Sequence, residues 1–543
     1  MENKSSTTLS NLSYALFFCL MLFAKAIGLP DESIVYTIIM CTACIFFIFK
    51  LVLTDHSMFE LILIISLLII SVVSYLLSKE RGILFITAVI LGAKDISIKR
   101  LFKYCAVIWT ASFITLTFCT QFGIISDYCL VHDKGSLGYI VRYSLGYPHP
   151  NVLHISYLVL VSLLLYALDL NLKQLRNVSI LLMILNVFVF IYSVSYTGLL
   201  IVTLYLVANY VLAYRKEKDQ HWPVFDLLIR LIFPFCVLFS VFGPVLFKGK
   251  LYDLCDKIIH HRFVLSNYYL TNEKLTLFGH ILQTPPDLNH SIDCSYVYLL
   301  VHCGIIPFVL ICIGYMLLIN HCVTNKEYKK LSIIMAFTIA GVTEPFMFNT
   351  SFKNISAVFI GEYLFISSKE ILTSPSAYPF LKRNIQLLKI GDNVISTQKI
   401  SNISSKITSM IRRGIDTLIS HIRCILVISA AVTVISLALS WAFIIKPTSV
   451  LIPASCCPDG YPGDPTYITE ESLSDTTYKT TRILSYSPRS EMVRFDGAIA
   501  DLEYKRIIFR NCFWAFIATL ILCDIVFNIK TSKSLQEERG NNS

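Results

Sequence analysis

Charged residues are scarce in this chain of 543 residues. They make up 15% of the sequence, whereas a soluble domain carries about 25%, and hydrophobic residues make up 55%. This composition excludes a soluble globular protein. The sequence instead contains 14 apolar runs, most of which approach the roughly 20 residues that a helix needs to cross a bilayer. We therefore predict an all-α polytopic membrane protein.

Several motifs are also missing. The sequence has no P-loop, no cysteine spacing typical of a zinc site, and no aspartate-rich outer loop that would hold a divalent cation. We therefore expect neither a metal nor another cofactor. The first apolar run lacks a small-residue cleavage site, so we interpret it as a membrane anchor and not as a signal peptide.

The apolar runs form two groups. The first 12 predict a membrane core within residues 1–373, and the last two predict an appended transmembrane hairpin within 423–529. Residues 374–422 predict a cytoplasmic linker, and residues 530–543 a cytoplasmic tail. The runs lie at about 12–28, 33–53, 58–77, 82–93, 104–126, 151–169, 177–194, 197–213, 227–247, 295–319, 331–348, 354–368, 423–445 and 508–529.

Basic residues indicate the orientation of the chain. If every run crosses the membrane, four lysine- and arginine-rich loops lie on one side, which the positive-inside rule makes cytoplasmic. The net charge of +10 is then explained by these loops and does not require a nucleic-acid partner. Both termini are expected inside, and the long loops 127–150, 248–294 and 447–507 are expected outside.

The end of the first long loop suggests a phosphate-binding site. Pro150 suits the first position of a helix, so we predict a membrane helix that begins there, with His149 beside it. The unpaired N–H groups of its first turn, with Arg142 and His149, would bind a phosphate. Alternatively, Arg142 is an interfacial arginine that reaches toward lipid headgroups.

Three further residues lie in or beside the predicted outer segments. Arg262 is either a second cation for the same phosphate or a solvated loop charge. Asp293 is either the N-cap of the next helix or a base that accepts the proton of a sugar hydroxyl. Glu344 lies at the end of an apolar run, where an acidic residue either has a function or pairs with a buried arginine.

These segments resemble a known family. Residues Arg142–Asn151, with the pattern Arg-x-Ser-x-Gly-x-x-His-Pro-Asn, and Asp293–Tyr296 resemble the Wzy-type polysaccharide polymerases. Leu91–Lys94 and Gly341–Glu344 are also similar to that family. The resemblance covers about residues 10–370 and extends more distantly to the O-antigen ligases of the same broad fold.

The resemblance implies a core with the GT-C-like polymerase/ligase fold in the cytoplasmic membrane of a bacterium. At the outer face, such an enzyme transfers a growing glycan from undecaprenyl diphosphate to a sugar hydroxyl of the next lipid-linked repeat unit. Arg142 and Arg262 fit the two arginines that are the family's hallmark. Many members also carry an arginine after a serine, but here Ser195 is followed by Tyr196.

The resemblance and the residue patterns together give a predicted site. The expected partners are an undecaprenyl-diphosphate-linked oligosaccharide, the lipid bilayer, and flippase and chain-length regulator proteins. Two alternatives stay open, namely a polysaccharide ligase and a transporter or flippase of lipid-linked oligosaccharides. The expected catalytic residues are Asp293, Arg142 and Arg262, and the expected substrate-binding residues are Arg142, His149, Asn151, Arg262, His290, Tyr296 and Glu344.

Overall fold

The chain divides into two compact units. Unit 1 comprises residues 1–114, 155–172 and 196–401, and unit 2 comprises residues 115–154, 173–195 and 402–543. These units do not follow the boundary predicted at residue 373. The computed structural model describes residues 6–133, 139–220, 222–283, 291–374, 378–388, 394–396, 406, 409, 414, 420–453, 456–457, 465–467, 481–483 and 491–541.

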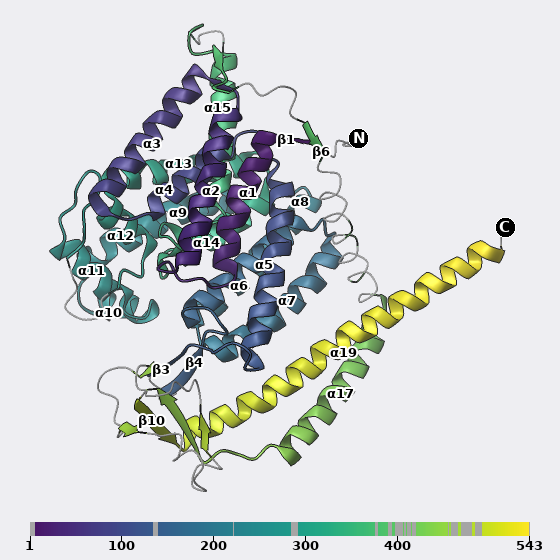
Figure 1. Cartoon of the computed structure of the whole chain (residues 1–543). Coiled ribbons are helices and arrows are strands. Elements are labelled where there is room, and N and C mark those ends of the chain that lie inside the picture. The colour runs from purple at the N-terminus through teal and green to yellow at the C-terminus, as the bar shows by residue number, and fades with distance from the viewer. Residues whose placement is uncertain are drawn as a thin grey trace. The chain divides into compact units, whose positions relative to one another are not determined.

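Helices dominate both units, as expected for an all-α polytopic membrane protein (Figure 1). Among the described residues, 11 helices are long and apolar enough to cross a membrane. Three of the 14 predicted runs form shorter helices. These are α4 (Gly82–Gly92), α14 (Tyr328–Ala340) and α15 (Ala357–Thr373), with 11, 13 and 17 residues.

Unit 1 contains most of the apolar helices, and α1 packs along α2 while α8 packs along α14. Helices α5 (Ile98–Gln121) and α6 (Pro150–Ala167) are divided between the two units. The other elements of unit 1 are β1 (Ser6–Thr8), α1 (Leu9–Ala26), α2 (Ile34–Leu53), β2 (His56–Ser57), α3 (Met58–Ser78), α8 (Tyr196–Glu217), α9 (Pro223–Leu246), α10 (Gly249–Ile258), α11 (Arg262–Asn272), α12 (Ser295–Tyr298), η2 (Leu299–Cys303), α13 (Ile305–Thr324), η3 (Pro345–Met347), β5 (Asn384–Ile385) and β6 (Val394–Ser396).

The run predicted as one helix over 295–319 is broken. The short helix α12 continues into the π-helical turn η2, and α13 begins only after Gly304. Gly304 has a φ of 100°, and a Cβ at this position would lie 2.3 Å from the backbone nitrogen of Gly279. Only glycine fits this conformation and this close approach, so the break is built into the sequence.

The segment before Gly279 covers the start of α13. The backbone N–H of Ile305 donates to the carbonyl of Thr276 at 3.0 Å, and that of Ile306 donates to the carbonyl of Leu277 at 3.0 Å. The first N–H groups of a helix have no partner within the helix. Here the carbonyls of Thr276 and Leu277, in another segment of the same chain, are the acceptors.

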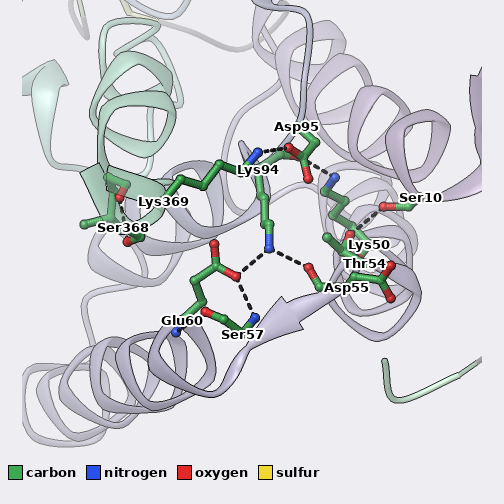
Figure 2. Close-up of polar contacts among 11 residues, drawn as sticks. Ser10, Lys50, Thr54, Asp55, Ser57, Glu60, Lys94, Asp95, Ser368 and Lys369 are labelled. Atoms are coloured by element: carbon green, nitrogen blue, oxygen red, sulfur yellow. Dashed lines mark hydrogen bonds and ion pairs between the residues drawn. The ribbon is translucent and has the colours of Figure 1, made fainter. Parts of the chain in front are cut away.

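A buried polar network joins the ends of several helices in unit 1 (Figure 2). The Nζ of Lys94, just after α4, lies 2.5 Å from a carboxylate oxygen of Glu60 in the first turn of α3. Lys50, near the end of α2, donates to the carbonyl of Lys94 at 2.7 Å. At the exposed edge of this network, Lys369 of α15 pairs with Asp95 at 2.8 Å. Removing one partner of a buried ion pair costs about 3–5 kcal/mol, so this network fixes how these helix ends meet.

Unit 2 contains a small sheet, formed by the segment that connects two long helices in the sequence. Strand β10 lies between β7 and β8, and β7 pairs with β9 in parallel. The antiparallel hairpin of β3 and β4 packs its buried valines against this sheet. The elements of unit 2 are β3 (Cys129–Asp133), β4 (Tyr139–Tyr143), α7 (Leu172–Ser193), α17 (Ile422–Phe443), β7 (Ser449–Pro453), β8 (Pro465–Tyr467), β9 (Thr481–Ile483), β10 (Glu491–Asp496) and α19 (Ala498–Asn541).

Candidate functional site

Arg142 lies on a strand and not in the polar loop that we expected. It belongs to β4 and is paired with Leu130 of β3. Successive side chains of a strand point to opposite faces. Val141 faces the buried core of unit 2, so Arg142 projects from the other face of the hairpin.

Two neutral acceptors among the described residues contact the guanidinium of Arg142. Its Nε donates to the carbonyl of Ser193 at 2.7 Å, and one Nη donates to the side-chain oxygen of Asn151 at 2.6 Å. The residue is only 5% exposed. An arginine that reached toward lipid headgroups would not be buried in this way, so the geometry favours a positioned guanidinium.

A tight turn connects Arg142 to the next helix. Tyr147 donates its backbone N–H to the carbonyl of Ser144 at 3.0 Å, and Gly146 in this turn has a φ of +88°. One carboxylate oxygen of Asp127 accepts from the backbone N–H of Gly146 and from the hydroxyl of Ser144, each at 3.1 Å. Burial outweighs these bonds and raises the pKa of Asp127 to about 6.

The predicted start of a membrane helix at Pro150 is confirmed. Helix α6 begins at Pro150, and the carbonyl of His149 accepts the backbone N–H of Leu153 at 3.1 Å, so His149 is the flanking residue. The Nδ1 of His149 accepts the backbone N–H of Asn151 at 3.1 Å. His149 therefore caps the helix, while Asn151 orients Arg142. Neither role was expected from the sequence.

A buried chain of polar groups continues from Ser193 into the helices. His154 of α6 contacts the hydroxyl of Ser193 through Nδ1 at 3.0 Å and the side-chain oxygen of Asn186 through Nε2 at 2.8 Å. All three residues are fully buried. They fix the end of α7, whose last carbonyl holds Arg142. We had not singled them out, although a polar triplet inside apolar runs was visible in the sequence.

Helix α19 supports the strand that carries Arg142. Arg506 donates to the carbonyl of Val141 at 2.6 Å and to Glu503 at 2.6 Å, and Glu503 accepts the hydroxyl of Tyr143 at 2.6 Å. Arg506 and Glu503 are both buried. The C-terminal hairpin, which we expected to be an appendage, thus contributes buried contacts on both sides of Arg142.

Arg262 is the first residue of α11 in unit 1. Asp256 caps this helix, because one of its carboxylate oxygens accepts the backbone N–H groups of Phe263 and Val264 at 3.0 and 3.2 Å. His260 and His261 before the helix have φ values of 52° and 64°, which turn the chain sharply. The turn and the cap together fix the direction in which Arg262 leaves the backbone.

Arg262 and Asp293 form an ion pair. An Nη of Arg262 lies 3.1 Å from a carboxylate oxygen of Asp293, and their side chains are 18% and 26% exposed. The other Nη donates to the carbonyl of His260 at 2.8 Å, and Nε lies 3.5 Å from the carbonyl of Thr343. A guanidinium carries five N–H groups, so two remain for a ligand. Arg262 is therefore more than a solvated loop charge.

Asp293 is not the N-cap that one interpretation of the sequence required. Helix α12 begins at Ser295 with Cys294 at the capping position, and the second carboxylate oxygen of Asp293 accepts the hydroxyl of Ser291 at 2.8 Å. The carboxylate is thus oriented by a hydroxyl and a guanidinium. Glu344 is buried, and its backbone carbonyl accepts the hydroxyl of Ser295 at 2.5 Å, which joins the start of α12 to the segment after α14.

Of two further residues predicted to bind substrate, Tyr296 lies in the helix packing, and the other is not among the described residues. The ring of Tyr296 is fully buried, and its hydroxyl donates to the carbonyl of Thr338 at 2.7 Å. These contacts account for Tyr296 within the helix packing, so we do not carry it into the proposed site. His290 lies outside the described residues.

Tyr196, which stands where many members of the polymerase family carry an arginine, contacts the loop that carries Arg262. Its ring stacks on that of His260, with centroids 6.2 Å apart. His260 is the residue whose carbonyl binds Arg262. An aromatic contact therefore supports the Arg262 loop at this position.

Comparison of the chain with protein-family models, with curated proteins and with solved structures finds no match.

Proposed function

We propose that this protein polymerises lipid-linked oligosaccharide repeat units by glycosyl transfer at a membrane surface. One observation carries the proposal. Arg262, Asp293 and Thr343 come from three segments that the sequence singled out separately, and in unit 1 they meet around one guanidinium. A partly exposed cation beside an oriented carboxylate provides the two groups that glycosyl transfer from a diphosphate requires.

The reaction assigns one role to each group. The bond between the anomeric carbon of the growing glycan and the diphosphate oxygen breaks, and the same carbon bonds to a hydroxyl oxygen of the acceptor sugar. Asp293 takes the hydroxyl proton, and the lipid diphosphate leaves with its negative charge stabilised by Arg262. Arg142 keeps the role that the sequence predicts for it, that of a contact to a phosphate. The leaving group is already good, so stabilising its charge lowers the barrier most. No step requires a metal ion.

The proposed setting is the outer face of the cytoplasmic membrane of a bacterium, with both termini inside. The basic loops support this orientation through the positive-inside rule. The donor and acceptor are then undecaprenyl-diphosphate-linked oligosaccharides. A flippase would deliver them, and a chain-length regulator would act on the same product.

An in vitro assay tests the proposal. The purified full-length protein is incubated with a defined repeat unit on a polyprenyl diphosphate, with a chelator present, and the products are sized on a gel. We expect a ladder of products. Arg142→Ala and Arg262→Ala should each abolish the ladder, whereas Arg230→Ala, which alters an exposed arginine of α9, should leave it intact.

The other outcomes identify the alternatives. A single product formed only when a different acceptor is added would indicate a ligase. Movement of labelled lipid across a vesicle membrane without any new glycosidic bond would indicate a transporter. A normal ladder from both Arg142→Ala and Arg262→Ala would contradict the assigned roles.

A further inference from the structure

Unit 1 contains a cavity of about 510 Å³ at the junction of α8 and α14. The last turn of α8 and the first turn of α14 line it, together with the segment that follows α6. Small-molecule sites typically have volumes of about 300–1,000 Å³. The cavity is thus large enough for a ligand the size of a lipid headgroup.

The cavity is separate from the Arg262 site. Arg262 contacts Thr343, just beyond the last residue of α14, and Tyr196 at the start of α8 stacks on His260. The cavity lies at the other end of both helices. The 22 residues of α8 alone span about 33 Å at about 1.5 Å per residue. Unit 1 therefore carries polar sites at the two opposite ends of the same helix pair.

Lysines outnumber carboxylates in the lining of the cavity. Asp169 forms ion pairs with two of these lysines. Its two carboxylate oxygens lie 2.8 Å from the Nζ of Lys99 and 3.8 Å from the Nζ of Lys329. Burial alone would raise the pKa of Asp169, but the neighbouring lysines lower it below its usual value. The lining contains Lys99, Lys216, Lys329 and Lys330 against Asp169, Glu217 and Glu327.

The lysines of the lining are not neutralised to the same extent. Lys330 is already neutralised, because its Nζ lies 3.0 Å from Glu327 and 2.5 Å from Glu362. Lys99 and Lys329 share Asp169 and have side chains that are 52% and 46% exposed. An anion that enters the cavity can therefore reach two incompletely neutralised ammonium groups.

The inner wall of the cavity adds neutral polar groups. Asn209 accepts the hydroxyl of Ser332 through its side-chain oxygen at 3.1 Å, which leaves its amide N–H groups as donors. The first turn of α14, which begins at Tyr328, contributes backbone N–H groups that the helix itself does not use. These donors suit the oxygen atoms of a phosphate group.

We propose that this cavity binds a phosphate-bearing ligand, with Lys99 and Lys329 as its cationic contacts. The phosphate belongs either to the headgroup of an anionic phospholipid or to a free phosphate compound. Basic pockets between transmembrane helices, on the side of the basic loops, are the setting in which anionic headgroups bind. The proposal does not depend on the transferase activity proposed above, because it involves the other end of α8 and α14.

Binding experiments on the full-length protein test the proposal. Inorganic diphosphate is titrated by calorimetry, and lipids retained from nanodiscs of phosphatidylcholine with or without phosphatidylglycerol are counted by native mass spectrometry. We expect at least one probe to bind. The double variant Lys99→Gln/Lys329→Gln should weaken that binding by about tenfold or more, since each lysine supplies a charge-assisted contact.

Two matched variants separate the cavity from its surroundings. Lys326→Gln removes the same charge from a lysine that pairs with Asp219 and does not line the cavity, so binding should be unchanged. Ala213→Phe fills the cavity without altering any charge, and it should weaken binding as the double variant does. This second variant remains informative if the loss of two lysines prevents folding.

The outcomes are distinct. Binding of diphosphate identifies a soluble ligand, and selective retention of phosphatidylglycerol identifies a lipid headgroup; either supports the proposal. It is overturned if the wild-type protein binds neither probe, if Lys326→Gln weakens binding as much as the double variant, or if Ala213→Phe binds as tightly as the wild type.

Discussion

Arg142 of unit 2 and Arg262 of unit 1 were predicted to share one task, and the structure holds them in different ways. Arg142 lies on a strand, is 5% exposed and donates to the neutral oxygens of Ser193 and Asn151. Arg262 begins a helix, keeps an 18% exposed side chain and pairs with the carboxylate of Asp293. The first is fixed by its surroundings, whereas the second stays partly exposed beside a charged partner.

The two arginines differ in how many distant parts of the chain determine their positions. The place of Arg142 depends on a hairpin, the end of α7 and the buried pair of Glu503 and Arg506 on α19, so distant parts of the chain determine it. The place of Arg262 depends on a nearby cap, Asp256, and on contacts to Asp293 and Thr343. We therefore expect substitutions near Arg142 to affect stability and activity together, and substitutions near Arg262 to affect mainly activity.

The largest effect should come from replacing Arg142 with lysine, and the same substitution at Arg262 is its comparison. Arg142→Lys loses the fork geometry that reaches both Ser193 and Asn151, so chain extension should fall by about 10³-fold and the protein should melt earlier. Arg262→Lys keeps a point charge beside Asp293 and should lose about tenfold, with unchanged melting. Rates from gel ladders and melting curves check both. Equal losses of chain extension and equal melting temperatures in the two variants would contradict this difference between the arginines.

The next effect concerns the carboxylate beside Arg262. Asp293→Asn removes the proposed proton acceptor but keeps a similar shape, so chain extension should fall by about 10²-fold while the repeat unit still binds. Ser291→Ala removes only the hydroxyl that contacts Asp293 and should cost a few-fold at most. Single-turnover assays measure the rate of chain extension in both variants. A fully active Asp293→Asn enzyme would rule out Asp293 as the base.

A smaller effect is expected from the turn that follows Arg142. Gly146→Ala places a Cβ in a backbone with a φ of +88°, and this Cβ would lie 2.7 Å from Leu116 and from Thr120. We expect a loss of about 2 kcal/mol or more in unfolding free energy. Gly123→Ala has a similar φ of +74° but open space around the Cβ, and it should cost about 1 kcal/mol. Equal losses would show that packing at Gly146 is unimportant.

The smallest effect is a change in pH dependence near Arg142. Burial raises the pKa of Asp127 to about 6, above the value of about 3.9 in an unfolded chain. The folded state therefore binds this proton more tightly, and its stabilising contribution is complete below about pH 4 and lost as the pH rises through about 6. Asp127→Asn should flatten this part of the melting temperature profile. An unchanged slope would contradict the assignment.

The sequence predicted the membrane class and one helix start with precision. Pro150 begins α6 as expected, because its ring fixes φ and its missing N–H is not needed in the first turn. The strand at Arg142 had a local signal in Tyr139, Ile140 and Val141, which are residue types that favour strands, but it was interpreted as a polar loop. A short strand is stable only when paired, and its partner β3 has no comparable signal.

The parts of the site that we missed depend on contacts between distant residues. Asn151 was predicted to bind substrate, and the structure adds that its side chain accepts from Arg142, a role that nothing local in the sequence indicates. The break at Gly304 had a local signal, a glycine inside an apolar run, but its cause is the close approach of Gly279. Periodicity shows which residues favour a helix, and it does not show which backbone passes beside it.

The contacts at the start of α13 limit where a phosphate can bind in unit 1. The N-terminus of a helix binds an anion through backbone N–H groups that have no other acceptor. At the start of α13, the N–H groups of Ile305 and Ile306 already donate to the carbonyls of Thr276 and Leu277. A diphosphate arriving there would have to displace main chain before it met any amide. With these amides occupied, the start of α13 offers a phosphate no free donor, and this is consistent with the role that we propose for the side chain of Arg262.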